Sequence, residues 1–90
     1  NLYLGAGNDT GLSRVSAGEV GVPSLTASGT IKTTPILVSA LTAAATVGAG
    51  TRKFVTDSTV AASGNFGAVV AGTGANIVPV YSDGTNWRIG

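Results

Sequence analysis

Hydrophobic and polar residues alternate most regularly in the C-terminal part of the chain, residues 51–90. Residues 52–57 (RKFVTD) and 65–71 (NFGAVVA) combine aromatic or β-branched residues with small or polar ones, which is typical of half-buried strands. We therefore predict a strand in each segment. The Gly-rich residues 72–75 (GTGA) predict a tight connection to the strand that follows.

A β-hairpin is predicted at the end of this part. Residues 77–82 and 85–89 flank Asp83 and Gly84, and Asp-Gly between two apolar runs is a strong hairpin signal. Because this dipeptide tolerates two positive φ angles, we expect a type I′ turn. The period of two places alternate residues of the first strand on opposite faces. One face is expected to carry Val78, Val80 and Ser82, and the other Ile77 and Tyr81.

Residues 1–24 predict very short strands separated by Gly-rich turns. Residues 2–4, 12–15 and 19–22 alternate apolar residues with small or polar ones. Segments this short do not form a stable sheet alone, but three chains wound together would stabilise them by pairing across subunits. We therefore expect an all-β fold, with a short-stranded trimeric shaft (β-helical or β-prism-like) and a C-terminal antiparallel β tip. Because the chain opens on such a segment without a Met, we also expect a fragment of a longer polypeptide.

The middle of the chain is the least regular part. Residues 29–33 alternate again, Pro35 then blocks a central ladder position, and residues 36–45 fit either a short helix or a loop. The predicted organisation has three parts: shaft-like β segments in residues 1–24, a connecting segment in residues 25–50, and a β tip or trimerisation module in residues 51–90.

The composition favours self-association. Apolar residues make up 43% of the chain, but most are Ala or Val, and there is no Cys or His to form a disulfide or hold a metal. Only 10% of the residues are charged and the net charge is +1, whereas a soluble monomer usually keeps about 25–35% of its surface charged. Residues 33–51 carry no charge, but they contain Pro35, Gly48 and Gly50, so we expect no membrane insertion. Burial against other copies of the chain explains the composition better.

No catalytic site, metal or cofactor is expected. Each of the four acidic residues lies at a turn or near a strand end, where it has a structural explanation. Without His or Cys, the usual nucleophile–base pairs are missing, and no phosphate-loop motif is present. The near-neutral charge argues against nucleic acid, and the single basic pair, Arg52-Lys53, is interpreted as a solvated strand edge.

One aromatic and polar constellation surrounds the Asp83-Gly84 turn, and two interpretations of it are open. In the first, aromatic rings stack on a sugar while polar groups bind its hydroxyls, which would make this a receptor or glycan site. In the second, Trp87 is the main core anchor of a domain with few large residues, and the strand pattern favours this interpretation. The candidate site residues are Tyr81, Asn86, Trp87 and Arg88.

Residues 49–57 (AGTRKFVTD) and 78–90 (VPVYSDGTNWRIG) resemble a module at the C-termini of tail-fibre and other virion proteins of bacteriophages and prophages. Residues 2–9 (LYLGAGND), with Leu12 and Arg14, are similar to a stretch found upstream in the same proteins. The resemblance implies an extracellular homotrimeric fibre on a virion, whose distal tip contacts a host-surface glycan or protein and which assembles with other virion tail proteins. It supplies no catalytic residue.

Three hypotheses follow from the sequence. The first is a structural module of a trimeric phage tail fibre involved in host attachment, with the C-terminal hairpin as a clasp that sets the register of three chains. The second is a carbohydrate-binding module centred on Tyr81, Asn86 and Trp87. The third is a non-catalytic trimerisation appendage of a larger depolymerase.

Overall fold

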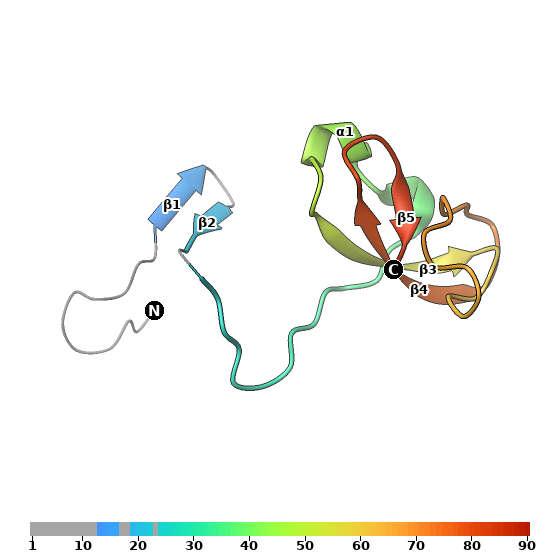
Figure 1. Cartoon of the computed structure of the whole chain (residues 1–90), viewed down its shortest axis with the longest axis horizontal. Helices are drawn as coiled ribbons and strands as arrows, with labels where there is room; N and C mark the ends of the chain where they lie inside the picture. Colours follow the sequence, from blue (N-terminus) through green and yellow to red (C-terminus); the bar gives the residue numbers. More distant parts are fainter. Residues whose placement is uncertain (1–12, 17–18, 23) are drawn as a thin grey trace. The chain divides into compact units, whose positions relative to one another are not determined.

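The chain forms two compact units, Asn1–Ile31 and Lys32–Gly90. A computed structural model describes residues 13–16, 19–22 and 24–90 (Figure 1). The second unit contains most of the secondary structure that is described. It takes in residues 32–50 together with the segment predicted as the C-terminal tip.

The described residues of the first unit include a pair of antiparallel strands. Strand β1 (Ser13–Ser16) pairs with β2 (Glu19–Gly21), with a register irregularity between Arg14 and Ser16. Two of the predicted short strands are therefore confirmed, and they pair with each other within one chain. The strand predicted at residues 2–4 lies outside the described residues.

An antiparallel sheet forms the centre of the second unit. Its order is β3 (Arg52–Ser58), β4 (Asn76–Ser82) and β5 (Trp87–Ile89), so β4 is the middle strand (Figure 1). Isolated bridges lie at both edges: Ile36 pairs in parallel with Val55, and Val69 pairs antiparallel with Arg88. The prediction of a small all-β domain with an antiparallel C-terminal sheet is confirmed.

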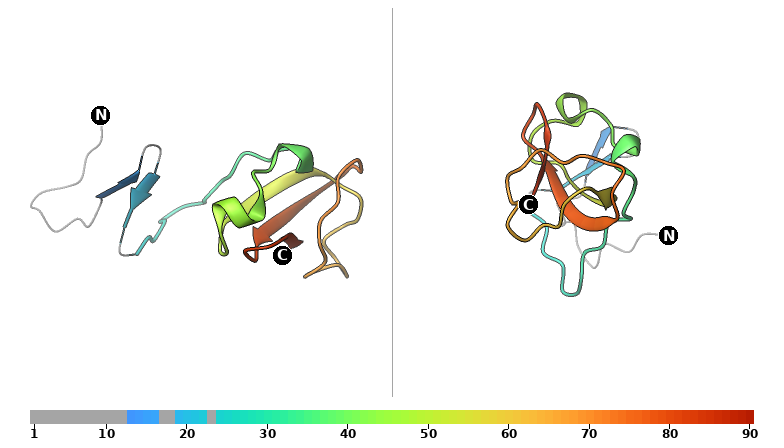
Figure 2. Two further views of the ribbon diagram at one scale, coloured as in Figure 1. Left: turned by 90° about the horizontal axis from the view of Figure 1, so that it is seen from above. Right: turned by 90° about the vertical axis from the view of Figure 1, so that its right-hand side faces the viewer.

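The residues before β3 form short helical turns. A 3-10 turn, η1, spans Val38–Ala40 and a single α-helical turn, α1, spans Ala44–Val47; both lie beside the sheet (Figure 2). Gly48 ends α1 with a positive φ of 88°, a conformation that favours glycine. Residues 36–45, predicted as helix or loop, contain both helical turns and loop. Residues 29–33, whose alternation favoured a strand, do not form a strand.

The prediction of a strand at residues 65–71 is wrong. This segment consists of turns and makes a single bridge, at Val69. Its extended conformation is interrupted because Gly64 and Gly67 adopt positive φ angles of 80° and 88°. The segment still follows β5: the Gly67 amide donates to the Ile89 carbonyl (2.7 Å), and the Val70 amide donates to the Trp87 carbonyl (3.0 Å).

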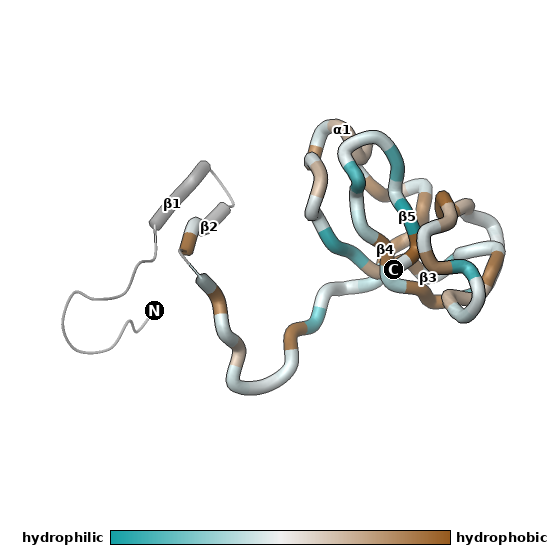
Figure 3. The backbone as a smooth tube through the Cα atoms, viewed as in Figure 1, coloured by the Kyte–Doolittle hydropathy of each residue, from teal (hydrophilic) through white to brown (hydrophobic). Residues whose placement is uncertain are grey.

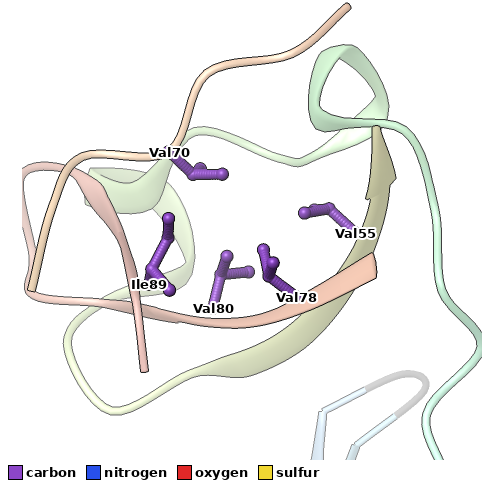
Figure 4. Close-up of a cluster of buried hydrophobic side chains, with 5 residues drawn as sticks. All are labelled: Val55, Val70, Val78, Val80 and Ile89. Atoms are coloured by element: carbon purple, nitrogen blue, oxygen red, sulfur yellow. The ribbon is translucent and has the colours of Figure 1, made fainter. Parts of the chain in front are cut away.

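A cluster of small side chains forms the core. All point from the sheet and its neighbouring loop toward one another (Figure 4). Each fully buried side chain of this size contributes about 1.5–3 kcal/mol relative to exposure. Half-buried Val38, Leu41, Ala62 and Trp87 pack around the cluster. The buried cluster consists of Val55, Val70, Val78, Val80 and Ile89.

The two predicted faces of β4 are confirmed. Val78, Val80 and Ser82 are at most 1% exposed, whereas Ile77 is 66% exposed. The buried hydroxyl of Ser82 is satisfied, because it donates to the Ala44 carbonyl (2.8 Å) and accepts from the Gly84 amide (3.1 Å). The same hydroxyl therefore ties α1 to the sheet.

Asp57 connects three segments at the far end of the sheet. Its carboxylate accepts hydrogen bonds from the Val38 amide (2.8 Å) and the Thr73 amide (3.2 Å), and its backbone carbonyl accepts from the Gly74 amide (2.7 Å). A bulge between Val55 and Ser58 allows this arrangement. The acidic residue predicted to close a strand therefore holds η1 and the 72–75 connection against β3.

Gly74 is expected to tolerate no side chain. A Cβ atom at this position would lie 2.1 Å from the Ser58 carbonyl oxygen and 2.6 Å from the Thr59 Cα atom. Gly74→Ala should therefore lower the free energy of unfolding by about 3 kcal/mol, because backbone must move to make room. Gly29→Ala is the matched control, since nothing lies within 4 Å of its Cβ position. Equal urea midpoints for the two variants would contradict this packing.

Candidate functional site

The hairpin loop that carries the candidate site is not a type I′ turn. Ser82 pairs with Trp87, so four residues, 83–86, connect β4 to β5. Gly84 has a positive φ of 94°, but Asp83 does not, and a type I′ turn needs both. The hairpin was predicted correctly and its turn type was wrong.

The Asp83 side chain determines this loop conformation. Its Oδ1 atom accepts hydrogen bonds from the backbone amides of Thr85 (2.8 Å) and Asn86 (2.7 Å). The Asp83 amide donates to the Asn86 carbonyl (3.1 Å). Because an Asp side chain can bond to backbone two and three residues ahead, it closes a wider loop than a two-residue turn.

Asp83 also forms an ion pair with Arg88. The Arg88 Nε atom donates to Asp83 Oδ2, and Arg88 Nη1 donates to the Gly67 carbonyl (2.9 Å). The hydrogen bond from the Asn86 amide, then the bonds from Arg88 and Thr85, lower the pKa of Asp83 to about 2. The same carboxylate raises the pKa of the Arg88 guanidinium. Arg88 is thus used to join the hairpin loop to the turn at Gly67.

Trp87 lies on the core face of the sheet. Its ring packs against the buried cluster, and its Nε1–H donates to the Thr42 carbonyl (2.8 Å). The aromatic ring and its polar group both therefore serve contacts within the chain. These contacts agree with the interpretation of Trp87 as a core anchor.

Tyr81 lies on the opposite face from Trp87. In the sheet register Tyr81 pairs with Arg52 of β3 and with Arg88 of β5, so these three residues form one row across the outer surface. Arg52 Nη2 donates to the Gly90 carbonyl (3.0 Å), and a Cβ atom at Gly90 would lie 3.1 Å from the Tyr81 ring. The structure thus brings Tyr81 and Arg88 together and places Trp87 on the other side, with Asn86 in the loop.

The same outer surface carries apolar residues that were not among the predicted site residues. Phe54 pairs with Pro79 across β3 and β4, and Ile77 lies two residues from Pro79 on the same side. Phe54 is 40% exposed and Ile77 is 66% exposed. We call Phe54, Ile77, Pro79 and Tyr81 the outer face. The signal was present in the sequence: residues 77–81 (IVPVY) are apolar at every position.

Other classes of site are not evident in the part of the chain that the structure describes. Those residues contain no group of three or more His, Cys, Asp or Glu that could hold a metal ion. Within the same residues, no helix is long and apolar enough to cross a membrane. Comparison with protein-family models, with curated proteins and with solved structures found no match.

Trp87→Ala is expected to lower the free energy of unfolding by about 3 kcal/mol, because it removes a half-buried ring and the hydrogen bond to Thr42. Urea unfolding followed by far-UV circular dichroism measures the change. Leu25→Ala is the control: Leu25 is 74% exposed and lies in the first unit, so this variant should lose little stability. A Trp87 variant as stable as the Leu25 variant would contradict the anchoring role.

Asp83→Asn is expected to change the acid sensitivity of the fold. The pKa of Asp83 in the folded chain, about 2, lies below its ordinary value of 3.8. The stability contributed by its charge is therefore complete above about pH 4 and is lost as the pH falls through 2. The wild-type chain should be more stable than Asp83→Asn at pH 6, and this difference should shrink at pH 2. A difference that is constant over this range would show that the carboxylate charge does not stabilise the loop.

Proposed function

We propose that this chain is a structural, non-enzymatic module: the C-terminal part of a homotrimeric phage tail fibre involved in host attachment. The observation that carries the proposal is the large share of apolar side chains left exposed. Leu37, Phe54, Phe66, Val69 and Ile77 of the second unit are between 40% and 70% exposed. A monomer with so little charge has few polar groups to keep such a surface in water.

The small core supports the same proposal. Its members are four valines and one isoleucine, and a unit of this size is marginally stable without a further source of stability. Such units usually rely on disulfides, a structural metal or association with other chains. The sequence contains no Cys and no His, so association is the source that its composition allows.

The two segments that resemble tail-fibre proteins lie in the same sheet. Residues 49–57 include all of β3 except its last residue. Residues 78–90 include most of β4 and all of the hairpin loop and β5. These two segments are paired in the central sheet. The motif therefore corresponds to a folded element with its own core, which supports its interpretation as the tip or clasp of a fibre.

Size-exclusion chromatography with multi-angle light scattering tests the assembly directly. The proposed trimer has three times the 8.7 kDa mass of a single chain. We expect this mass over a range of loading concentrations, because obligate assemblies bury apolar surface that a free chain would expose. A single-chain mass at all concentrations, or a stable dimer, would contradict the proposal.

A further inference from the structure

One edge of β3 pairs with β4, and its other edge is paired at a single residue. The Ile36 amide donates to the Phe54 carbonyl (3.0 Å), and the Thr56 amide donates to the Ile36 carbonyl (3.0 Å). These two bonds form the parallel bridge between Ile36 and Val55. In the described part of the chain this bridge is isolated, and no strand continues it toward Arg52 at the start of β3. The first half of this edge therefore lacks a neighbouring strand.

The backbone of β3 directs bonding groups to this open edge. In a strand, the N–H and C=O groups of one residue point to the same side, and successive residues alternate sides. The Phe54 carbonyl bonds to Ile36, so the Phe54 amide faces the same edge. Arg52, two residues earlier, directs its carbonyl there as well. The register agrees, because Phe54 is opposite Pro79, which has no N–H to exchange with it on the β4 side.

Residues 32–35 (KTTP), which directly precede the bridge, have the sequence of an edge strand. Threonine is β-branched and favours extended backbone, and Lys and Pro are typical of strands that end a sheet. By alternation from Ile36, the Pro35 nitrogen faces away from β3, so its missing N–H costs no bond to β3. Figure 3 shows brown apolar positions separated by paler polar ones along the stretch between β2 and the sheet. We call residues 32–35 the strap.

The connection after the strap suits a parallel pairing. Parallel strands need a crossover of about a dozen or more residues, usually with a helix. Residues 37–51 connect Ile36 to β3 and contain both η1 and α1. The bond from the Val38 amide to Asp57 and the bond from Ser82 to the Ala44 carbonyl hold these turns against the sheet. The crossover that a parallel strand requires is therefore already in place.

Thr33 provides an independent sign that the strap has a second arrangement. Its hydroxyl oxygen is buried and has no hydrogen-bond partner among the described residues. A buried hydroxyl without a partner is unfavourable and rare. If the strap pairs with β3 in the register of the Ile36 bridge, Thr33 lies opposite Arg52, on the outer face of the sheet. Its hydroxyl then reaches water, and the cost of its burial is removed.

We propose that the strap closes onto β3 as a fourth strand, parallel to β3 and continuous with the Ile36 bridge. In the closed form the Phe54 amide donates to the Thr34 carbonyl, and the Thr34 amide donates to the Arg52 carbonyl. All of these residues belong to one chain. The inference therefore goes beyond the proposed function and does not depend on the proposed trimer.

Closing the strap has two consequences. Pro35 lies opposite Phe54 in this register and covers part of a ring that is 40% exposed. Fewer unpaired residues then remain between β2 and the sheet, and the chain enters the second unit along the direction of β3. The strap is thus a conformational device that sets the length of the free connection.

Hydrogen exchange of single amides, followed by NMR, tests the closed strand. Thr34→Pro removes the amide that donates to the Arg52 carbonyl and places a ring against β3. If the strap closes, the Phe54 amide is protected in the wild type, and it should exchange at least about tenfold faster in Thr34→Pro.

Two controls accompany this measurement. Ile31→Pro places a proline in the same stretch but outside the strap, so protection of the Phe54 amide should be kept. The Val70 amide, which bonds to the Trp87 carbonyl, reports the rest of the sheet and should exchange equally in all three chains.

A cysteine pair replaces this test if Thr34→Pro unfolds the second unit. The native chain has no Cys, so Thr34→Cys with Lys53→Cys introduces the only two thiols. In the closed register these residues are opposite each other on strands about 4.8 Å apart, which suits a disulfide. Thr30→Cys with Lys53→Cys is the control pair, and it should oxidise more slowly because Thr30 lies outside the strap.

Each outcome decides the inference. Loss of Phe54 protection in Thr34→Pro alone supports it, as does a disulfide within one chain that forms faster for the Thr34 pair. A Phe54 amide that exchanges at the same rate in all three chains overturns it. A disulfide that joins two chains, or equal oxidation of the two pairs, also overturns it. A monomeric wild type overturns the proposed function and leaves this inference standing.

Discussion

The structure depends on the burial of a few small side chains on one face of a twisted antiparallel sheet. All three strands of the sheet contribute side chains that are at most 1% exposed: Val55, Val78, Val80 and Ile89. The core therefore forms only when the strands pair in this register. A shift of β4 by one residue would exchange its inner and outer faces. Because both faces are apolar, hydrophobicity distinguishes them less than in most sheets. Side-chain shape and polar contacts must therefore contribute to the register.

Those polar contacts come from short side chains at the two ends of the sheet. Asp57 holds η1 and the 72–75 connection at one end, and Ser82 holds α1 and the hairpin loop at the other. Asp83 closes the loop and neutralises Arg88. Both acidic residues of the second unit thus have structural partners. Although the chain has very few charged residues, both of these carboxylates make contacts that hold loops against the sheet.

Much of the sheet could be predicted from the sequence, whereas its loops could not. The period of two in β4 correctly divided its residues between two faces, and the apolar segments around Asp83-Gly84 identified a hairpin. The turn type was wrong because the Asp83 side chain bonds to backbone amides, which the dipeptide signal does not include. Residues 65–71 were wrong because Gly64 and Gly67 adopt positive φ angles that interrupt a strand-like pattern. The candidate site residues were chosen because they are close in sequence, but the strand register places Tyr81 and Trp87 on opposite faces of the sheet.

The proposed assembly buries apolar surface of the second unit, so folding of this unit and assembly of the chains should be coupled. The dependence of the thermal unfolding midpoint on protein concentration tests this most directly. Coupling requires the midpoint to rise as the chain is concentrated, because mass action stabilises an assembly and leaves a monomer unaffected. A midpoint that is the same over a hundredfold range of concentration would show that the second unit is stable without other copies of the chain, and would contradict the proposed assembly.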